Sequence, residues 1–94
     1  AAASVTVREP IREYVTRLAT YTRENAQLGA SPRASIALLR AAQGRALLLQ
    51  RDFVLPDDVQ TEARVVFPHR IQPGTTETTP EEIVDNAIDT VPVE

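Results

Sequence analysis

Hydrophobic positions recur at helical spacing in separate stretches of the 94-residue chain. In the first stretch, apolar residues return every three or four positions, which is the spacing of one face of an α-helix. They are Ile11, Tyr14, Val15, Leu18 and Ala19. Because the φ angle of proline is already helical, Pro10 suits the first position. The pattern predicts a helix from about Pro10 to about Arg23.

The second stretch is the most apolar and predicts a helix over residues 32–49. Its apolar residues surround the helix almost completely: Ile36, Leu38, Leu39, Ala41, Ala42, Ala46, Leu47, Leu48 and Leu49. A helix that is apolar on most sides is typical of the buried centre of a bundle. Gly44 costs roughly 1 kcal/mol relative to alanine inside a helix. We expect a close approach of two helices to explain why glycine occupies position 44.

Two further helices begin with recognisable start signals. Pro56-Asp57-Asp58-Val59 places two acids in the first turn and predicts a helix to about Val66, ended by Pro68. Leu55 before it offers no capping hydroxyl, a loss of about 1 kcal/mol. Thr79-Pro80-Glu81-Glu82 is a capping box. It opens a helix from about Pro80 to Thr90 whose apolar stripe is Ile83, Val84, Ala87, Ile88 and Val91.

The remaining segments connect these helices. Residues 4–7 alternate polar and apolar side chains and predict a short extended leading segment, residues 51–54 an extended link, and residues 72–79 a linker containing Pro73-Gly74. The sequence thus predicts an all-α fold, a small four-helix bundle with short extended segments. Residues 4–71 form a three-helix core, and residues 80–94 form a C-terminal helix and tail of the same domain. Residues 1–3 are expected to be an artificial remnant or a cut end, because the chain contains no Met.

Composition excludes several classes of function. Aromatic residues make up 4% of the chain, so Leu, Ile, Val and Ala must build the core, which favours helices over a β-sandwich. The chain has no Cys and one His, and therefore no metal site is expected. All ten basic residues are Arg, so a phosphate-binding loop with its lysine is impossible. No apolar run is long enough to span a bilayer.

Charge is unevenly distributed along the chain. Residues 1–70 hold ten arginines and seven acids, whereas residues 71–94 hold six acids and no base. The acidic tail either packs across the basic body or is a solvated acidic helix, and both interpretations remain open.

The start of the second helix carries an unusual charge. Ser31 is a good N-cap, and Pro32 suits the first helical position. Arg33 then lies in the first turn, where the helix dipole disfavours a cation. The positive end of a helix together with a guanidinium can form an anion site, and phosphate is the usual anion. The alternative is a solvated arginine that merely tolerates its position.

The segment GASPRASIALLRAAQGRALLLQRDFVLPDDV resembles the lid subdomain of the MoxR family of AAA+ ATPases. The resemblance is carried by the signature at 29–34, the Leu/Ala-rich helix, Arg-Asp-Phe-Val at 51–54 and Pro-Asp-Asp-Val at 56–59. It extends to His69-Arg70-Ile71 and to Val91-Pro92-Val93, which is similar to the family's C-terminus, so the chain is expected to lack only its front. Leu55 and Gly44 depart from the family, which has Thr or Ser and a larger small residue at these places.

The resemblance implies an AAA+ lid in which Arg33 is the sensor 2 arginine. In this role Arg33 would act catalytically by reaching the γ-phosphate of ATP bound on a preceding domain. Ser31, Pro32 and Ala34 are then expected at the nucleotide, and Tyr14 is expected either to stack on the adenine or to lie in the core with its hydroxyl at the surface. ATP and Mg²⁺ belong to the full-length protein, and the fragment alone is expected neither to bind them nor to be an enzyme.

The same resemblance implies partners and a cellular role. The partners are the protein's own N-terminal AAA+ domain, neighbouring subunits of a hexameric ring and, as one candidate, a protein with a von Willebrand factor A domain. The implied activity is chaperone-like remodelling of a client by an ATP-hydrolysing, cytoplasmic parent, without nucleic acid or a membrane span. His69 and Arg70 match a pair in the family, and a lone His near a helix end is most often structural.

Two alternative functions remain open at this point. A long central helix, a basic turn at Arg51 and the Pro-Asp-Asp-Val start are also typical of a histone-fold-like module that binds DNA or dimerises. The absence of Lys and the net charge of −3 argue against binding to a phosphate backbone. The other alternative is a plain helical-bundle interaction domain in which Arg33 is incidental.

Overall fold

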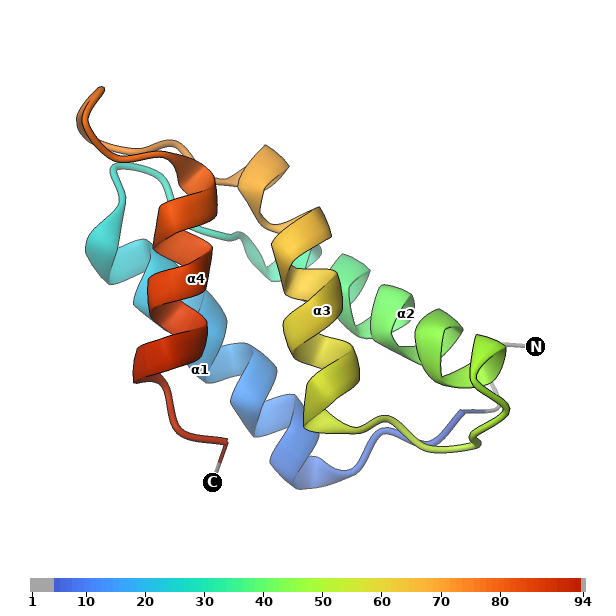
Figure 1. Ribbon diagram of the computed structural model, residues 1–94. Coiled ribbons are helices and arrows are strands. Elements are labelled where there is room, and N and C mark those ends of the chain that lie inside the picture. The colour runs from blue at the N-terminus through green and yellow to red at the C-terminus, as the bar shows by residue number, and fades with distance from the viewer. Residues whose placement is uncertain (1–4, 94) are drawn as a thin grey trace.

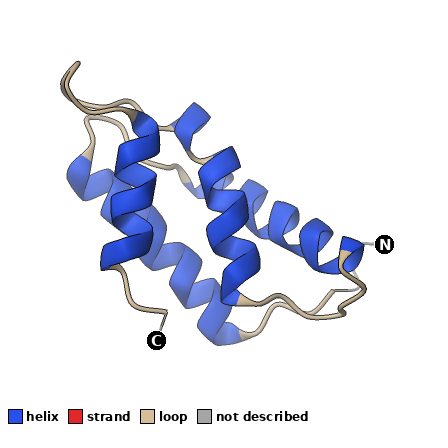
Figure 2. Cartoon of the chain, in the orientation of Figure 1, coloured by secondary structure: helices blue, strands red, loops and turns tan. Residues whose placement is uncertain are grey.

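The computed structural model describes residues 5–93, and its regular structure is helical (Figures 1 and 2). The helices are α1 (Glu9–Asn25), α2 (Pro32–Leu48), α3 (Pro56–Val66) and α4 (Pro80–Thr90), with a short 3-10 helix, η2 (Pro68–Arg70), after α3. The predicted all-α four-helix bundle is confirmed. The interpretation of residues 1–3 lies outside the described residues.

Helix α1 supplies the side of the bundle on which the other three helices pack. The face predicted from its spacing is buried, as is Thr22 one turn further on. Helices α3 and α4 lie side by side across α1 (Figure 1). Helix α4 buries Ile83, Val84 and Ala87, so it docks on α1 and α3 of its own bundle.

Helix α2 lies at the edge of the bundle, and the prediction that it forms the buried centre is wrong. It packs against α3 and α1, mainly through small residues, and its buried positions are Ala34, Leu38, Ala42 and Ala46. Leu48 is 85% exposed and Ile36 is 52% exposed. Helix α4 makes its contacts with α1, α3 and η2, which leaves the outer side of α2 uncovered by the described residues. The expected reason for Gly44 is also wrong, because a Cβ added there would meet no atom within 4 Å.

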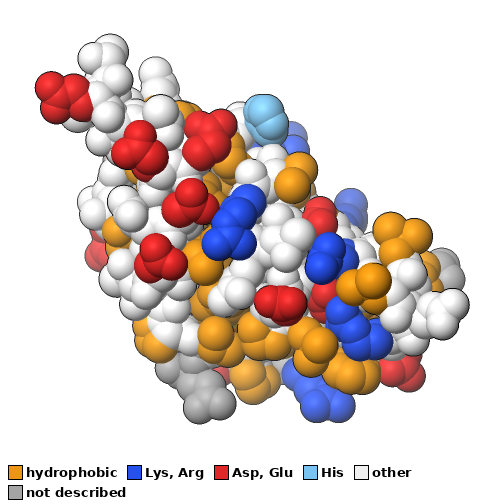
Figure 3. Space-filling model, viewed as in Figure 1, with side chains coloured by type: hydrophobic (Ala, Val, Ile, Leu, Met, Phe, Trp, Pro, Cys, Tyr) orange, Lys and Arg blue, Asp and Glu red, His pale blue; other side chains and the backbone are white. Residues whose placement is uncertain are grey.

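The acidic C-terminal helix both packs on the bundle and exposes its acids to solvent, so each of the two interpretations of its charge holds in part. Its apolar face packs on the bundle, while Glu81, Glu82, Asp85 and Asp89 are exposed. Figure 3 shows acidic side chains gathered over this side of the molecule. Arg64 Nε lies 3.0 Å from Asp85 Oδ1 in an ion pair that is half exposed on both sides. The helix is therefore held by apolar packing, since such exposed pairs contribute little.

Two isolated backbone bridges each pair two extended segments that lie outside the helices. Thr6 pairs in parallel with Phe53: its N–H donates to Asp52 O at 2.8 Å, and its carbonyl accepts from Val54 N at 3.0 Å. Leu28 pairs antiparallel with Gln72, with N···O distances of 3.0 and 2.7 Å. The leading segment and the start of the linker are thus both fixed to loops between helices.

A buried carboxylate joins the end of α2 to the start of α3. Asp58 is fully buried and accepts from Arg51 Nη1 and Nη2 at 2.7 and 2.8 Å. Arg45 Nε lies 3.3 Å from Oδ1. The backbone N–H of Leu55 donates to Oδ2 at 2.8 Å, so Asp58 caps the helix whose N-cap residue has no hydroxyl. This bond explains how α3 begins after a leucine.

The surroundings of Asp58 set its ionisation. Burial alone would raise the pKa of the carboxyl group, but hydrogen bonds from Arg51 and Leu55 and the charges of Arg51 and Arg45 together hold the pKa below its ordinary value. The same hydrogen bond raises the pKa of Arg51. Asp58 is consequently ionised at neutral pH, and its stabilising contribution is complete above the ordinary pKa of the unfolded chain and is lost as the pH falls through the lowered pKa of the folded state.

We expect Asp58→Asn to lower the free energy of unfolding by about 3 kcal/mol at pH 7, because it leaves two arginines without a buried counter-charge. Denaturant titrations at pH 7 and at about pH 2.5 measure this, and the gap between wild type and variant should narrow at the acid pH, because protonation of Asp58 is easier in the unfolded chain and removes part of its contribution to stability. The matched control is Asp57→Asn at the exposed neighbouring position, with an expected change within about 1 kcal/mol. Equal losses from both variants would contradict this account.

Candidate functional site

The loop before α2 is held by the last turns of α1. The hydroxyl of Thr22 donates to Ala19 O at 2.7 Å and accepts from Ala30 N at 2.9 Å, and both bonds are buried. Arg23 Nε donates to Ala30 O at 2.8 Å. Both backbone groups of Ala30, itself fully buried, are therefore satisfied by side chains of α1. The residue that precedes the N-cap of α2 thus has a fixed place.

Gly29 permits this attachment because its backbone lies against that of Arg23. A Cβ at position 29 would stand 2.4 Å from both Cα and N of Arg23, closer than real Cβ contacts occur. The neighbouring atoms are backbone within a helix and cannot move aside cheaply. The glycine of the Gly-Ala-Ser-Pro-Arg-Ala segment is therefore required by close packing.

The first turn of α2 has the geometry that the sequence predicted. Ser31 Oγ accepts from Ala34 N at 3.2 Å, and Pro32 occupies the first helical position. Ala34 is fully buried and its N–H is used by this cap, so it supports the turn from inside. Ser31, Pro32 and Arg33 are exposed.

Arg33 presents an unpaired positive charge at the positive end of α2. Neither its guanidinium nor its backbone N–H has a hydrogen-bond or ion-pair partner within residues 5–93. A guanidinium beside the N-terminus of a helix favours an anion of planar or tetrahedral oxygen geometry. Chemically, the site can bind and orient a phosphate group.

Tyr14 is not at this site. Its ring is fully buried in the core, and its hydroxyl accepts from Gln60 Nε2 at 3.1 Å. In this arrangement the ring offers no open face on which an adenine could stack. Of the two alternatives for Tyr14, the structure shows the core residue, but its hydroxyl is buried against Gln60 and not at the surface as expected.

The described part of the chain offers little for a divalent cation. No group of three or more acidic or histidine side chains between residues 5 and 93 is arranged to hold a metal ion. Within residues 5–93, the start of α2 with Arg33 has the donors that suit a phosphate group, and no ligand set for Mg²⁺ is present. Among the same residues, no helix combines the length and apolar character needed to cross a membrane.

Sequence reasoning missed the residues that hold the site in place. Arg23 stands at the predicted end of α1 and outside its apolar stripe, yet its Nε donates to the carbonyl of Ala30. The sequence did contain a signal that Thr22 holds the loop. This residue continues the apolar stripe one turn beyond Leu18, so it is a polar residue in a core position. A buried hydroxyl needs a partner, and the preceding turn together with the following loop supplies two.

Comparisons with known proteins find a family model and related sequences. The family model for the AAA lid domain matches residues 18–87. The chain is 47% identical over 70 residues to the uncharacterized protein YeaC of Bacillus subtilis (strain 168), covering 72% of this chain and 22% of the relative. It is 33% identical over 105 residues to the chaperone MoxR1 of Mycobacterium tuberculosis, covering 96% and 28%.

A solved structure shares the fold. The crystal structure of a "putative ATPase" from Cytophaga hutchinsonii superimposes with a TM-score of 0.89 at 29% identity, over 97% of this chain and 32% of that one. The chain thus spans less than a third of the length of each of these three proteins.

We expect Gly29→Ala to lower the free energy of unfolding by about 2 kcal/mol, because the methyl group overlaps the backbone of Arg23. The control is Gly74→Ala, where the nearest atom, Gln27 Cβ, is an ordinary 3.8 Å away. Urea unfolding followed by circular dichroism compares the two variants. An unchanged midpoint for Gly29→Ala would show that the loop can move away from α1 without loss.

Proposed function

The chain belongs to the AAA lid domain family, as a lid of the MoxR-like AAA+ type, and we propose that it closes over ATP bound on a preceding nucleotide-binding domain. The observation that supports this proposal is the exposed guanidinium of Arg33 at the start of α2, on a turn that α1 holds rigidly. A group that must meet a phosphate arriving from outside has to be exposed, unpaired and fixed in place.

In this proposal Arg33 acts as the sensor 2 residue. Its guanidinium donates charge-assisted hydrogen bonds to the γ-phosphate and thereby orients the lid relative to the nucleotide-binding domain. Loss of that phosphate removes the hydrogen-bond acceptor of Arg33. The guanidinium then loses its contact, and the lid changes its angle relative to the nucleotide-binding domain. Arg33 thus combines stabilisation of charge at the phosphate with a response to the nucleotide state.

Ser31, Pro32 and Ala34 serve the same site mainly by shaping it. Ser31 caps the start of the first turn, and Pro32 fixes the backbone angle of the residue that precedes Arg33. Ala34 packs inward beneath them. Exposed Ser31 and Pro32 also lie where a nucleotide held by Arg33 would touch the turn.

The full-length protein is proposed to be an ATPase with chaperone-like activity. ATP supplies the phosphoryl group, and Mg²⁺ is held by the preceding domain. The lid rotation is passed to neighbouring subunits of a ring, which we propose to be a hexamer, and through them to a client. A partner with a von Willebrand factor A domain and a cytoplasmic location belong to the same proposal.

Family membership favours this function over the alternatives weighed from the sequence. A histone-fold-like module gives no role to the fixed turn at 29–34, whereas an AAA+ lid does. A plain interaction domain remains distinguishable by experiment, since Arg33 would then be incidental to every activity of the parent.

The test is steady-state ATP turnover by the full-length parent carrying Arg33→Ala. A charge-assisted hydrogen bond contributes about 1.5–3 kcal/mol, so we expect kcat/KM to fall at least about tenfold. Circular dichroism should show the fold unchanged, because Arg33 makes no bond within the described chain. The control is Arg12→Ala, an exposed arginine on α1, with turnover expected within about twofold. Robust and equal turnover in wild type and Arg33→Ala would remove Arg33 from the nucleotide site.

A further inference from the structure

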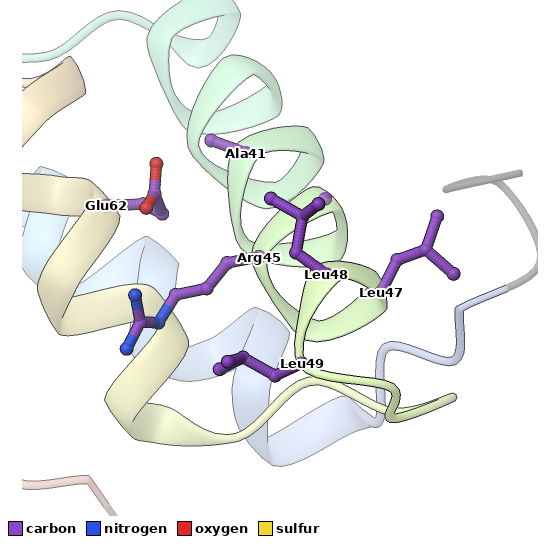
Figure 4. A pocket seen from close by; sticks show the side chains of 7 residues that line it. Ala41, Arg45, Leu47, Leu48, Leu49 and Glu62 are labelled. Atoms are coloured by element: carbon purple, nitrogen blue, oxygen red, sulfur yellow. The ribbon is translucent and has the colours of Figure 1, made fainter.

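The end of α2 borders an apolar groove that faces α3. Its volume is about 580 Å³, and its lining includes Gly44, Arg45, Leu47, Leu48, Leu49 and Glu62. Figure 4 shows Arg45 reaching from α2 toward α3, Glu62 opposite it, and the leucines on the α2 side. Single exposed leucines are ordinary on a protein surface, but three consecutive ones, each 43% exposed or more, beside a groove mark a surface for a partner.

Gly44 is the second feature of this groove that indicates a partner. Glycine destabilises the interior of a helix relative to alanine. Nothing within the described chain requires it, because a Cβ at this position would meet open space. A bare stretch of helix backbone lining an apolar groove is suited to a partner side chain that approaches the backbone closely.

The chain reaches the bundle beside this groove. The carbonyl of Val5 accepts from Gln43 Nε2 at 2.9 Å, one residue before Gly44. Thr6 then pairs with Phe53, just beyond the end of α2. The described chain therefore begins beside the last two turns of α2. The relatives leave ample length for a preceding part, since the chain spans 22–32% of each.

The charge around the groove indicates the chemistry of its occupant. Arg45 and Glu62 both line the groove, and Arg45 is already paired with Asp58. Arg40 lies one turn before Gly44, is exposed and has no ion-pair partner within residues 5–93. A complementary surface is apolar at its centre and carries carboxylates at its rim.

We propose that this groove is the docking site for the domain that precedes the chain in the same polypeptide. That domain inserts an apolar side chain over Gly44 and Leu48 and sets a carboxylate against Arg40. The proposal rests on the proposed function for the existence of a preceding nucleotide-binding domain. It adds a second contact between the two domains, at the opposite end of α2 from Arg33.

The experiment measures thiol accessibility in the full-length parent. The chain has no Cys, so Leu48→Cys and, as a control, Thr75→Cys introduce single thiols into this part of the protein. Both positions are exposed within the chain itself. Maleimide labelling is followed by mass spectrometry of the modified peptide, and each rate is normalised to that of the urea-unfolded parent.

We expect the thiol at position 48 to react at least tenfold more slowly than the thiol at position 75. The protection should persist at dilutions where light scattering shows a monomer. Equal rates at the two positions would overturn the proposal. Protection that appears only in assembled protein would also overturn it, in favour of a neighbouring copy as the occupant.

A second variant tests the docking mode. Gly44→Leu fills the groove without touching any atom of the bundle near its Cβ. In the Leu48→Cys parent it should raise the labelling rate at least fivefold, and unchanged protection would refute the close approach at Gly44. None of these measurements uses ATP, so failure of docking is distinguishable from failure of the lid function. Turnover lost in Arg33→Ala, together with an unprotected position 48, would refute docking alone.

Discussion

The structure depends on one buried carboxylate, Asp58, and the two arginines around it. Arg45 comes from α2, Arg51 from the link and Asp58 from the first turn of α3, so one cluster fixes the corner at which α2 and α3 join. Gln50 stands at φ 62°, where glycine is usual, and the N–H of Arg51 bonds back to Ala46 O. This strained turn brings Arg51 to the carboxylate. The ring of Phe53 lies 6.0 Å from Arg51 and 5.5 Å from Arg8, which connects the leading segment to the same corner.

The two ends of α2 are fixed by different means. At its start, the side chains of Thr22 and Arg23 hold the backbone of Ala30, and Gly29 lies against the backbone of α1. At its end, charged side chains make the attachment. Between these ends the helix buries mostly alanines, which allows it to lie close to α1 and α3 while its outer side stays uncovered by the described residues. A helix that is firmly held along one side and open along the other is suited to present residues to a second body.

Local patterns predicted most of the fold, and non-local contacts account for what they did not. The stripes of α1 and α4 and the cap at Ser31 depend on residues within one or two turns, so spacing alone revealed them. The burial of α2 could not be read in this way: leucines such as Leu47 and Leu48 look equally apolar whether they face the core or a partner. Asp58 appeared only as a first-turn acid, because nothing local indicates that Arg51, seven residues earlier, turns back to it. The position of Arg33 was predictable, but its support by Arg23 was not, since that bond depends on how the loop folds.

The pairing of Thr6 with Phe53 has a mechanical consequence. It attaches the leading segment at one end of α2, while Arg33 stands at the other end, roughly 25 Å away for a helix of this length. The rigid bundle is then a lever whose pivot is the leading segment and whose tip is Arg33. A rotation of about 10° at the pivot moves the tip by roughly 4 Å, since displacement is arm length times angle. That distance exceeds the range of a hydrogen bond, so a small turn of the domain suffices to make or break the contact that we propose between Arg33 and a phosphate.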